Sequence, residues 1–181
     1  IANLTVIVLA IPLLFSWLRD PLGSVNYGLF SAGSILFGVR NFHGFFDFLP
    51  MPVEYWWPLV SASLGWSLGL IWIFLLRFSD YRWRGFELAL AAFTVAGSAA
   101  LFMVPTDRFM ALSPWLWYVP QFLIGIFCVG AFTYRTISKP TLHRAILLVG
   151  ILGQMGPAVH DVLWIEGAGS FSSILWMALS F

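Results

Sequence analysis

The sequence WWPLVSASLGWSLGLIWIFLLRF, residues 56–78, is the clearest membrane-spanning segment of this chain. Its only charged residue, Arg77, stands at its far end. About 20 apolar residues are needed to cross the hydrocarbon core of a bilayer, which is about 30 Å thick. Similar apolar stretches flank it at residues 1–18, 24–48, 86–104, 113–134 and 145–165, and a shorter one at 170–181. The sequence therefore predicts an all-α, polytopic transmembrane helical bundle of seven helices.

The composition excludes a water-soluble protein. Hydrophobic residues make up 60% of the chain, charged residues only 9%, and the mean hydropathy is +0.89. So little polar surface cannot coat a soluble protein of this size. We therefore interpret residues 1–181 as a single transmembrane domain whose partner is the lipid bilayer, and we expect no nucleic-acid partner.

The basic residues predict the orientation of the bundle. Seven of the nine Lys and Arg residues fall at the first, third and fifth connections: Arg19, Arg77, Arg82, Arg84, Arg135, Lys139 and Arg144. By the positive-inside rule these connections are cytoplasmic, so the N-terminus lies outside and the C-terminus is cytoplasmic. The seventh segment, residues 170–181, covers only about 18 Å at 1.5 Å per residue. We therefore expect this helix to be truncated and the chain to be a fragment of a longer protein.

Small residues predict where helices approach closely. Ser61, Gly65 and Gly69 recur every four residues on the third segment, and the fourth segment carries Ala92, Ala96 and Ala100 at the same spacing. Such small faces let helices pack closely within a bundle, with a homodimer face as the alternative interpretation.

Tryptophans predict the membrane interfaces, because an amphipathic ring prefers the level of the lipid headgroups. We expect the following residues to be anchors at the outer and inner ends of the segments: Trp56, Trp57, Trp115, Trp117 and Trp164 outside, and Trp17 and Trp83 inside.

Polar residues inside the second segment form a stripe. Arg40, His43 and Asp47 are spaced three and four residues apart, which places them within about 60° of one another on a helix. Because this segment runs outward, the stripe lies in its outer half. Charged groups at this depth should face the bundle interior and be paired.

The sixth segment carries a second polar cluster at a similar depth. Gln154 and Asp161 share a helix face, and His160 lies beside Asp161. Arg40 is the natural ion-pair partner of either Asp47 or Asp161. Three interpretations stay open: a buried lock that fixes helix register, a pocket for a small polar ligand at the outer face, or a metal site.

Catalytic and cofactor signatures are weak. His43, Asp47, His160 and Asp161 are acceptable zinc ligands, but the HxxxH and HExxH spacings are absent. No lysine lies within a segment, and no phosphate-binding loop or GxSxG elbow occurs. We therefore expect no cofactor and no catalytic residue in this chain.

Four motifs support a family resemblance: RNFHGFFDF at residues 40–48, SLGWSLGLIWIFLLRF at 63–78, RWRGFE at 82–87 and HDVLW at 160–164. In order and spacing the chain resembles the membrane domain of the bacterial seven-transmembrane receptors with diverse intracellular signalling modules. The resemblance implies an outer sensor domain and a cytoplasmic output, such as a histidine kinase of a two-component system or a diguanylate cyclase. The resemblance also implies that five residues of this chain belong to a polar core near the outer face: Arg40, Asn41, His43, His160 and Asp161.

The sequence therefore predicts a signal-relay domain in the bacterial inner membrane. Signalling bundles commonly act as dimers, and by this analogy alone a homodimer is one assembly that the sequence allows. Two alternatives remain, a metal-dependent membrane lipid hydrolase and a structural accessory subunit of a membrane complex.

Overall fold

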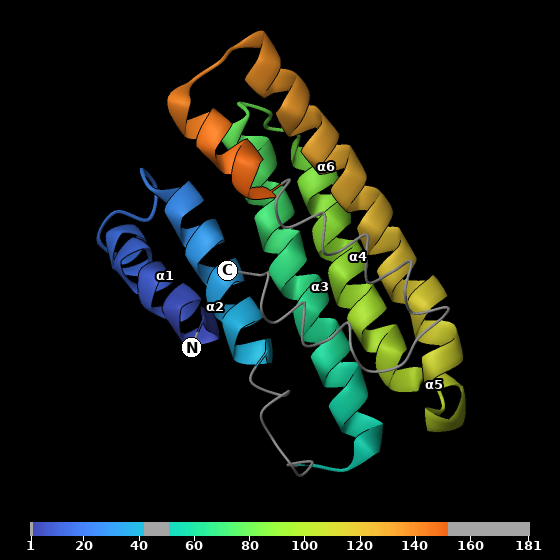
Figure 1. Cartoon of the computed structure of the whole chain (residues 1–181). Coiled ribbons are helices and arrows are strands. Elements are labelled where there is room, and N and C mark those ends of the chain that lie inside the picture. Colours follow the sequence, from blue (N-terminus) through green and yellow to red (C-terminus); the bar gives the residue numbers. More distant parts are fainter. Residues whose placement is uncertain (1, 42–50, 152–181) are drawn as a thin grey trace. The chain divides into compact units, whose positions relative to one another are not determined.

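The computed structural model describes residues 2–41 and 51–151, and every regular element in these two ranges is helical (Figure 1). The predicted all-α class is confirmed for this part of the chain. The elements are α1 (Ala2–Arg19), α2 (Val25–Asn41), α3 (Val53–Phe78), α4 (Arg84–Met103), α5 (Thr106–Ser113), the π-helical turn η2 (Pro114–Tyr118), α6 (Val119–Ser138) and a last helix, Leu142–Ile151.

Three helical runs within the described residues are long and apolar enough to cross a membrane: Val53–Phe78, Arg84–Met103 and Ala111–Ser138. They correspond to the third, fourth and fifth apolar stretches of the sequence. The 26 residues of α3 rise about 39 Å at 1.5 Å per residue, more than the thickness of a bilayer core. The count of seven spans and the orientation stay predictions.

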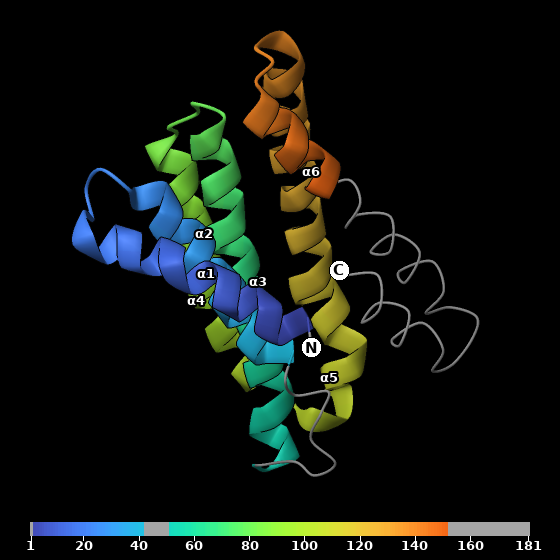
Figure 2. The ribbon, with the colours of Figure 1, turned by 60° about the vertical axis from the view of Figure 1, so that its left-hand side comes forward.

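The chain divides into two compact units, of which the first ends at Cys128 and the second begins at Val129. In the first unit α3 lies between α2 and α4 and contacts both (Figure 1). Figure 2 shows the same helices with α1 and α2 turned toward the viewer. The rings of Phe30 and Phe74 meet across α2 and α3 with centroids 5.1 Å apart. Gly33 brings α2 close to the backbone of α3, since a Cβ at this glycine would lie 3.2 Å from the carbonyl oxygen of Ser67.

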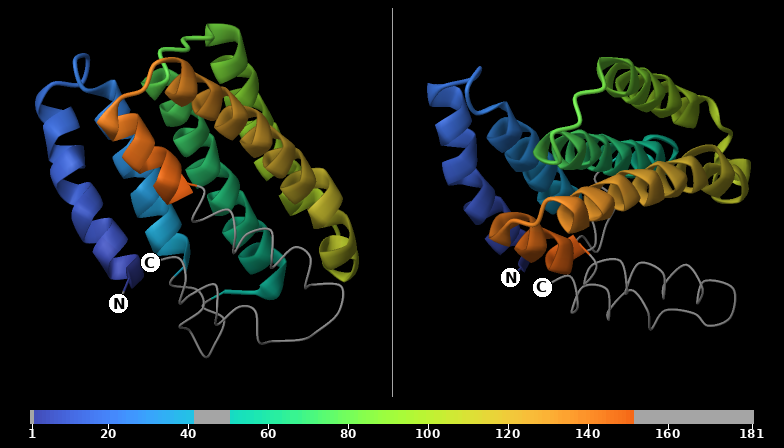
Figure 3. Two further views of the ribbon diagram at one scale, coloured as in Figure 1. Left: turned by 45° about the horizontal axis from the view of Figure 1, so that its top comes forward. Right: turned by 90° about the horizontal axis from the view of Figure 1, so that it is seen from above.

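A short capped turn joins α1 to α2 in the first unit (Figure 3). The Asp20 carboxylate accepts a hydrogen bond of 3.1 Å from the backbone N–H of Gly23, and the Asp20 carbonyl oxygen accepts one from the N–H of Ser24. Trp17 then lies against Gly28 so closely that a Cβ there would overlap the indole ring. The glycine therefore sets the distance between α1 and α2.

The connection from α3 to α4 is a Schellman motif. The N–H of Tyr81 donates to the Leu76 carbonyl oxygen at 2.9 Å, and the N–H of Asp80 donates to the Arg77 carbonyl oxygen at 3.0 Å. Asp80 has φ 64°, the left-handed conformation that this motif requires at its C′ position. The chain reverses here without the glycine that usually fills this position.

The inward face of α4 differs from the sequence prediction. Leu90, Thr94 and Leu101 are buried, and a Cβ at Gly69 of α3 would lie 3.3 Å from Oγ1 of Thr94. The face formed by Ala92, Ala96 and Ala100 is exposed instead. The prediction that these alanines pack within the bundle is wrong for the described residues, because the bulkier face of the same helix makes the contact with α3.

The second unit contains the end of α6 and the helix Leu142–Ile151. Thr141 caps this helix, and its hydroxyl oxygen accepts a hydrogen bond of 3.3 Å from the N–H of Arg144. The guanidinium of Arg144 donates back to the Lys139 carbonyl oxygen at 3.2 Å. The basic turn predicted at the fifth connection is thus a structured cap.

Candidate functional site

Trp117 lies at the centre of the first unit. Its side chain is 1% exposed, and its six-membered ring fits between two glycines, Gly65 of α3 and Gly97 of α4. A Cβ at Gly65 would overlap Cζ2 of the ring, and a Cβ at Gly97 would overlap Cζ3 on the opposite edge. The predicted role of Trp117 as a headgroup anchor is therefore wrong, whereas its neighbour Trp115 is 72% exposed, as expected of an anchor.

The physical reason for this difference is helix geometry. Two residues apart on a helix, side chains point to nearly opposite sides, so only one of Trp115 and Trp117 can face the bundle. The ring of Phe93 stacks on Trp117 with a centroid distance of 5.5 Å and an interplanar angle of 21°. Ala62, Leu101 and Phe109 complete this apolar core.

Ser61 of α3 holds both aromatic residues of the η2 turn. Nε1 of Trp117 donates to the Ser61 carbonyl oxygen at 2.7 Å, and the hydroxyl groups of Ser61 and Tyr118 share a hydrogen bond of 2.8 Å. A carbonyl oxygen has two lone pairs, so it can accept the indole N–H in addition to a helical bond. One residue of α3 thus positions two consecutive residues of the Ala111–Ser138 run.

Arg40 joins this arrangement from α2. Its half-buried guanidinium lies near Tyr118, close enough for the charge of one group to influence the other. Together, Arg40, Ser61 and Tyr118 bring polar groups of α2, α3 and η2 to one place beside the apolar packing of Trp117. We call these three residues the polar junction.

The π-helical turn explains how Trp117 and Tyr118 both reach Ser61. The backbone N–H of Val119 donates to the carbonyl oxygen of Pro114, five residues earlier. This wider turn changes the phase of the helix between α5 and α6. A π-turn inside an α-helix is rare and frequently marks a functional site. Pro120, which lacks an N–H, follows directly and cannot restore the regular α-helical bond at its own position.

Of the residues that the sequence analysis assigned to the site, Arg40 is described in full and Asn41 is the last residue of α2. The others, His43, Asp47, Gln154, His160 and Asp161, lie outside the described residues, so their roles stay predictions. The ion pair of Arg40 with Asp47 or Asp161 is equally untested. What the structure adds is Tyr118 as a neighbour of Arg40.

Sequence analysis missed Ser61, Trp117 and Tyr118 as members of the site. A signal was present for Ser61, because the four-residue spacing with Gly65 predicts a contact face on α3. No sequence signal showed that an indole and a phenol, rather than a helix backbone, occupy that face. The prolines at positions 114 and 120 were the only local indication of irregular helix geometry between them.

A second polar contact lies at the C-terminal end of α3. Arg77 donates two hydrogen bonds to the Glu87 carboxylate of α4, from Nε to Oε1 at 2.8 Å and from Nη2 to Oε2 at 2.5 Å. The two side chains are 30% and 14% exposed. This bidentate pair fixes the α3–α4 turn within the basic segment that the charge pattern assigns to the cytoplasm.

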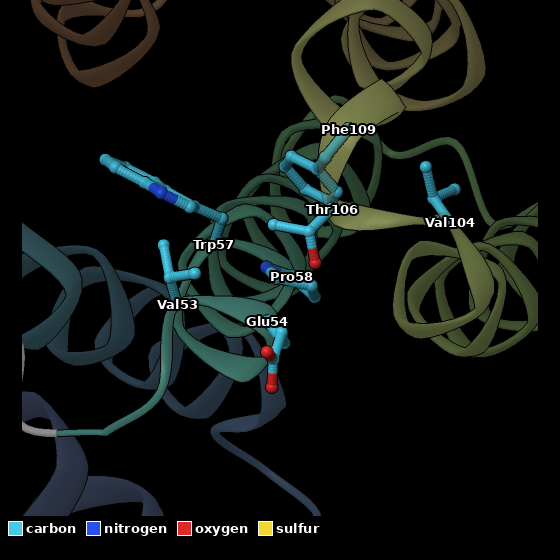
Figure 4. Close-up of a pocket in the computed structure, with 7 residues that line it drawn as sticks. All are labelled: Val53, Glu54, Trp57, Pro58, Val104, Thr106 and Phe109. Carbon is cyan, nitrogen blue, oxygen red and sulfur yellow. The ribbon is translucent and has the colours of Figure 1, made fainter.

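A shallow hollow lies where α3 begins and the α4–α5 connection passes (Figure 4). Its volume is about 10 Å³, room for a single water molecule and far below the range of roughly 300–1,000 Å³ that is usual for ligand pockets. The described residues that line it are Val53, Glu54, Trp57, Pro58, Val104, Thr106 and Phe109. None of these residues belongs to the predicted polar stripes, and the hollow gives no indication of a ligand.

The described residues contain no group of three His, Cys, Asp or Glu side chains that could hold a metal ion. The four candidate zinc ligands of the sequence all lie outside this part of the chain. Cys128 is buried, as expected for a small residue in a membrane segment.

Comparison with known proteins adds no relative: no protein-family model, curated protein or solved structure matches this chain.

Proposed function

We propose that this chain is the membrane-spanning relay of a bacterial receptor, in which the polar junction couples α2 to α3 and to the η2 turn. The observation that carries the proposal is that Ser61 hydrogen-bonds to both Trp117 and Tyr118, and that Arg40 of α2 lies near Tyr118. The receptor resemblance of the sequence and the bias of its basic residues support the same function.

The free-energy cost of placing the charge of Arg40 inside a membrane bundle favours a functional role for the polar junction over a purely structural one. A charged side chain inside a membrane bundle is costly, and such residues commonly mark relay or ligand sites. Arg40 carries its charge close to Tyr118, so a movement of the η2 turn changes the surroundings of that charge. A stimulus that favours one arrangement of these contacts shifts the population of bundle conformations.

The helix α3 provides a physical route from the junction to the basic turn. Ser61 and Arg77 are 16 residues apart, or about 24 Å along the helix axis. The bidentate bonds between Arg77 and Glu87 make α4 follow any movement of this end of α3. In the predicted orientation this movement arrives at the cytoplasmic face, where the resemblance places a kinase or cyclase output.

The test is Tyr118→Phe in the full-length receptor, because this change removes only the hydroxyl that binds Ser61. The matched control is Tyr55→Phe, since Tyr55 is 58% exposed on the same helix as Ser61. We expect Tyr118→Phe and Arg40→Gln to change the ratio of stimulated to basal output several-fold, while Tyr55→Phe leaves it unchanged. Normal membrane insertion with an unchanged ratio in both junction variants would contradict the relay.

A further inference from the structure

Buried polar atoms without hydrogen-bond partners gather along the contact of α3 with the first half of α6. Gln121 of α6 is 3% exposed, and neither Oε1 nor Nε2 of its carboxamide has a hydrogen-bond partner among the described residues. Nε1 of Trp72 in α3 is equally shielded and, within the same part of the chain, equally unpaired.

Gly125 places these groups in the same contact. A Cβ at Gly125 would lie 2.8 Å from Cζ2 of Trp72 and 3.5 Å from Cε2, the ring atom bonded to Nε1. The Cζ2–Cη2 edge of the six-membered ring therefore lies against Gly125, and Nε1 is two bonds away from Cζ2. Gln121 precedes Gly125 by four residues, which places its side chain on the same face of α6, one turn away. We call the contact formed by Trp72, Gln121 and Gly125 the α3–α6 seam.

Buried amide and indole groups rarely stay without partners. Their desolvation is costly, and inside a membrane no outside water compensates for it. The seam has three N–H donors and one carbonyl acceptor. Gln121 lies one helical turn before Gly125, the residue that the ring of Trp72 contacts. A water molecule both donates and accepts, and buried waters typically bond such groups in protein interiors.

We propose that the α3–α6 seam binds internal water that bridges the carboxamide of Gln121 to the indole N–H of Trp72. This inference stands independently of the relay proposal. The water is the polar link between α3 and this part of α6, because the adjoining contact at Gly125 is apolar. The junction at Ser61 and Tyr118, by contrast, uses direct hydrogen bonds.

The direction of the change in melting temperature distinguishes a hydrated seam from a seam whose polar groups are unpaired. Gln121→Met keeps the length of the side chain but removes its polar atoms. If water bridges the two residues, Gln121→Met and Trp72→Phe each lower the melting temperature by a few degrees. Their combined effect is then smaller than the sum, since both remove the same bridge. If the groups are unpaired, Gln121→Met leaves the melting temperature unchanged or raises it, which overturns the proposal.

Radiolytic hydroxyl labelling of the full chain detects the water directly, because bound water generates the radical next to the buried ring. We expect oxidation of Trp72 to fall several-fold in Gln121→Met. Trp117 is the matched control, since its N–H already donates to Ser61, and its labelling should stay low in both proteins. Equal oxidation of Trp72 in the two proteins would overturn the proposal even if the variant were less stable.

Discussion

Substitution of Gly65 by alanine tests the central packing of the first unit most sharply. An alanine in a helix interior is favoured over glycine by about 1 kcal/mol. At Gly65 this gain is opposed by overlap of the new Cβ with the ring of Trp117. The ring cannot easily move away, because Nε1 is bonded to Ser61 and Phe93 covers one face. Overpacking of this kind costs about 1–3 kcal/mol.

Gly130→Ala is the matched control, because Gly130 is an exposed glycine in α6 and no atom of the described residues lies within 4 Å of its added Cβ. If overpacking costs about 2 kcal/mol, the Gly65→Ala variant should melt about 4–8 °C below Gly130→Ala, using roughly 2–4 °C per kcal/mol for a chain of this size. The chain provides its own reporter: its single cysteine, Cys128, is 0% exposed and reacts with a thiol-specific fluorophore only on unfolding.

A double-mutant cycle identifies the partner of Gly65. Trp117→Leu removes the ring atoms that the new Cβ meets, so Gly65→Ala should become neutral or stabilising in that background. The coupling free energy should then be about 1–3 kcal/mol. If Gly65→Ala stabilises the protein as much as Gly130→Ala does, the position of the Trp117 ring between Gly65 and Gly97 is refuted.

Three further predictions concern other parts of the chain. Arg77→Gln should lower the free energy of unfolding by about 1 kcal/mol, because it breaks a partly buried bidentate pair. Asp107→Asn changes an exposed pair with a 3.9 Å separation and should leave the melting temperature unchanged. Equal effects of the two substitutions would contradict the role of the α3–α4 pair. Asp80→Val should destabilise the protein by about 1–2 kcal/mol, because a β-branched residue is strained at φ 64°, and a neutral result would argue against this turn conformation. Elemental analysis of the purified chain should find no stoichiometric zinc, while one zinc per chain that a chelator removes would favour the hydrolase alternative over the relay.

The fold class could be predicted because membrane helices depend on local properties. Residues 56–78 have the length and apolarity of a span whatever their neighbours are, and α3 covers them entirely. The same holds for α4 and for the run of Ala111–Ser138. By contrast, the π-helical turn at Pro114–Tyr118 could not be predicted, since nothing in helix periodicity shows where a wider turn occurs.

The candidate site was predictable only in part. Arg40 was identified because a charge in an apolar segment is costly wherever it points. Tyr118 was missed because a tyrosine near a segment end is usually an interfacial residue. Its role depends on the distance of its hydroxyl from Ser61, 57 positions earlier in the chain.

The helical class, the positions of the apolar segments and the charge of Arg40 within one of them are all readable from the sequence, since each depends only on the local composition of a segment. That Trp117 fills the space between Gly65 and Gly97 while Trp115 faces outward depends on contacts between helices and is seen only in the folded chain. Contacts between helices also determine that α4 presents Leu90, Thr94 and Leu101 to α3 rather than its alanines. The physical reason is that the rotation of each helix about its axis is set by the side chains of its neighbours, which local sequence does not contain.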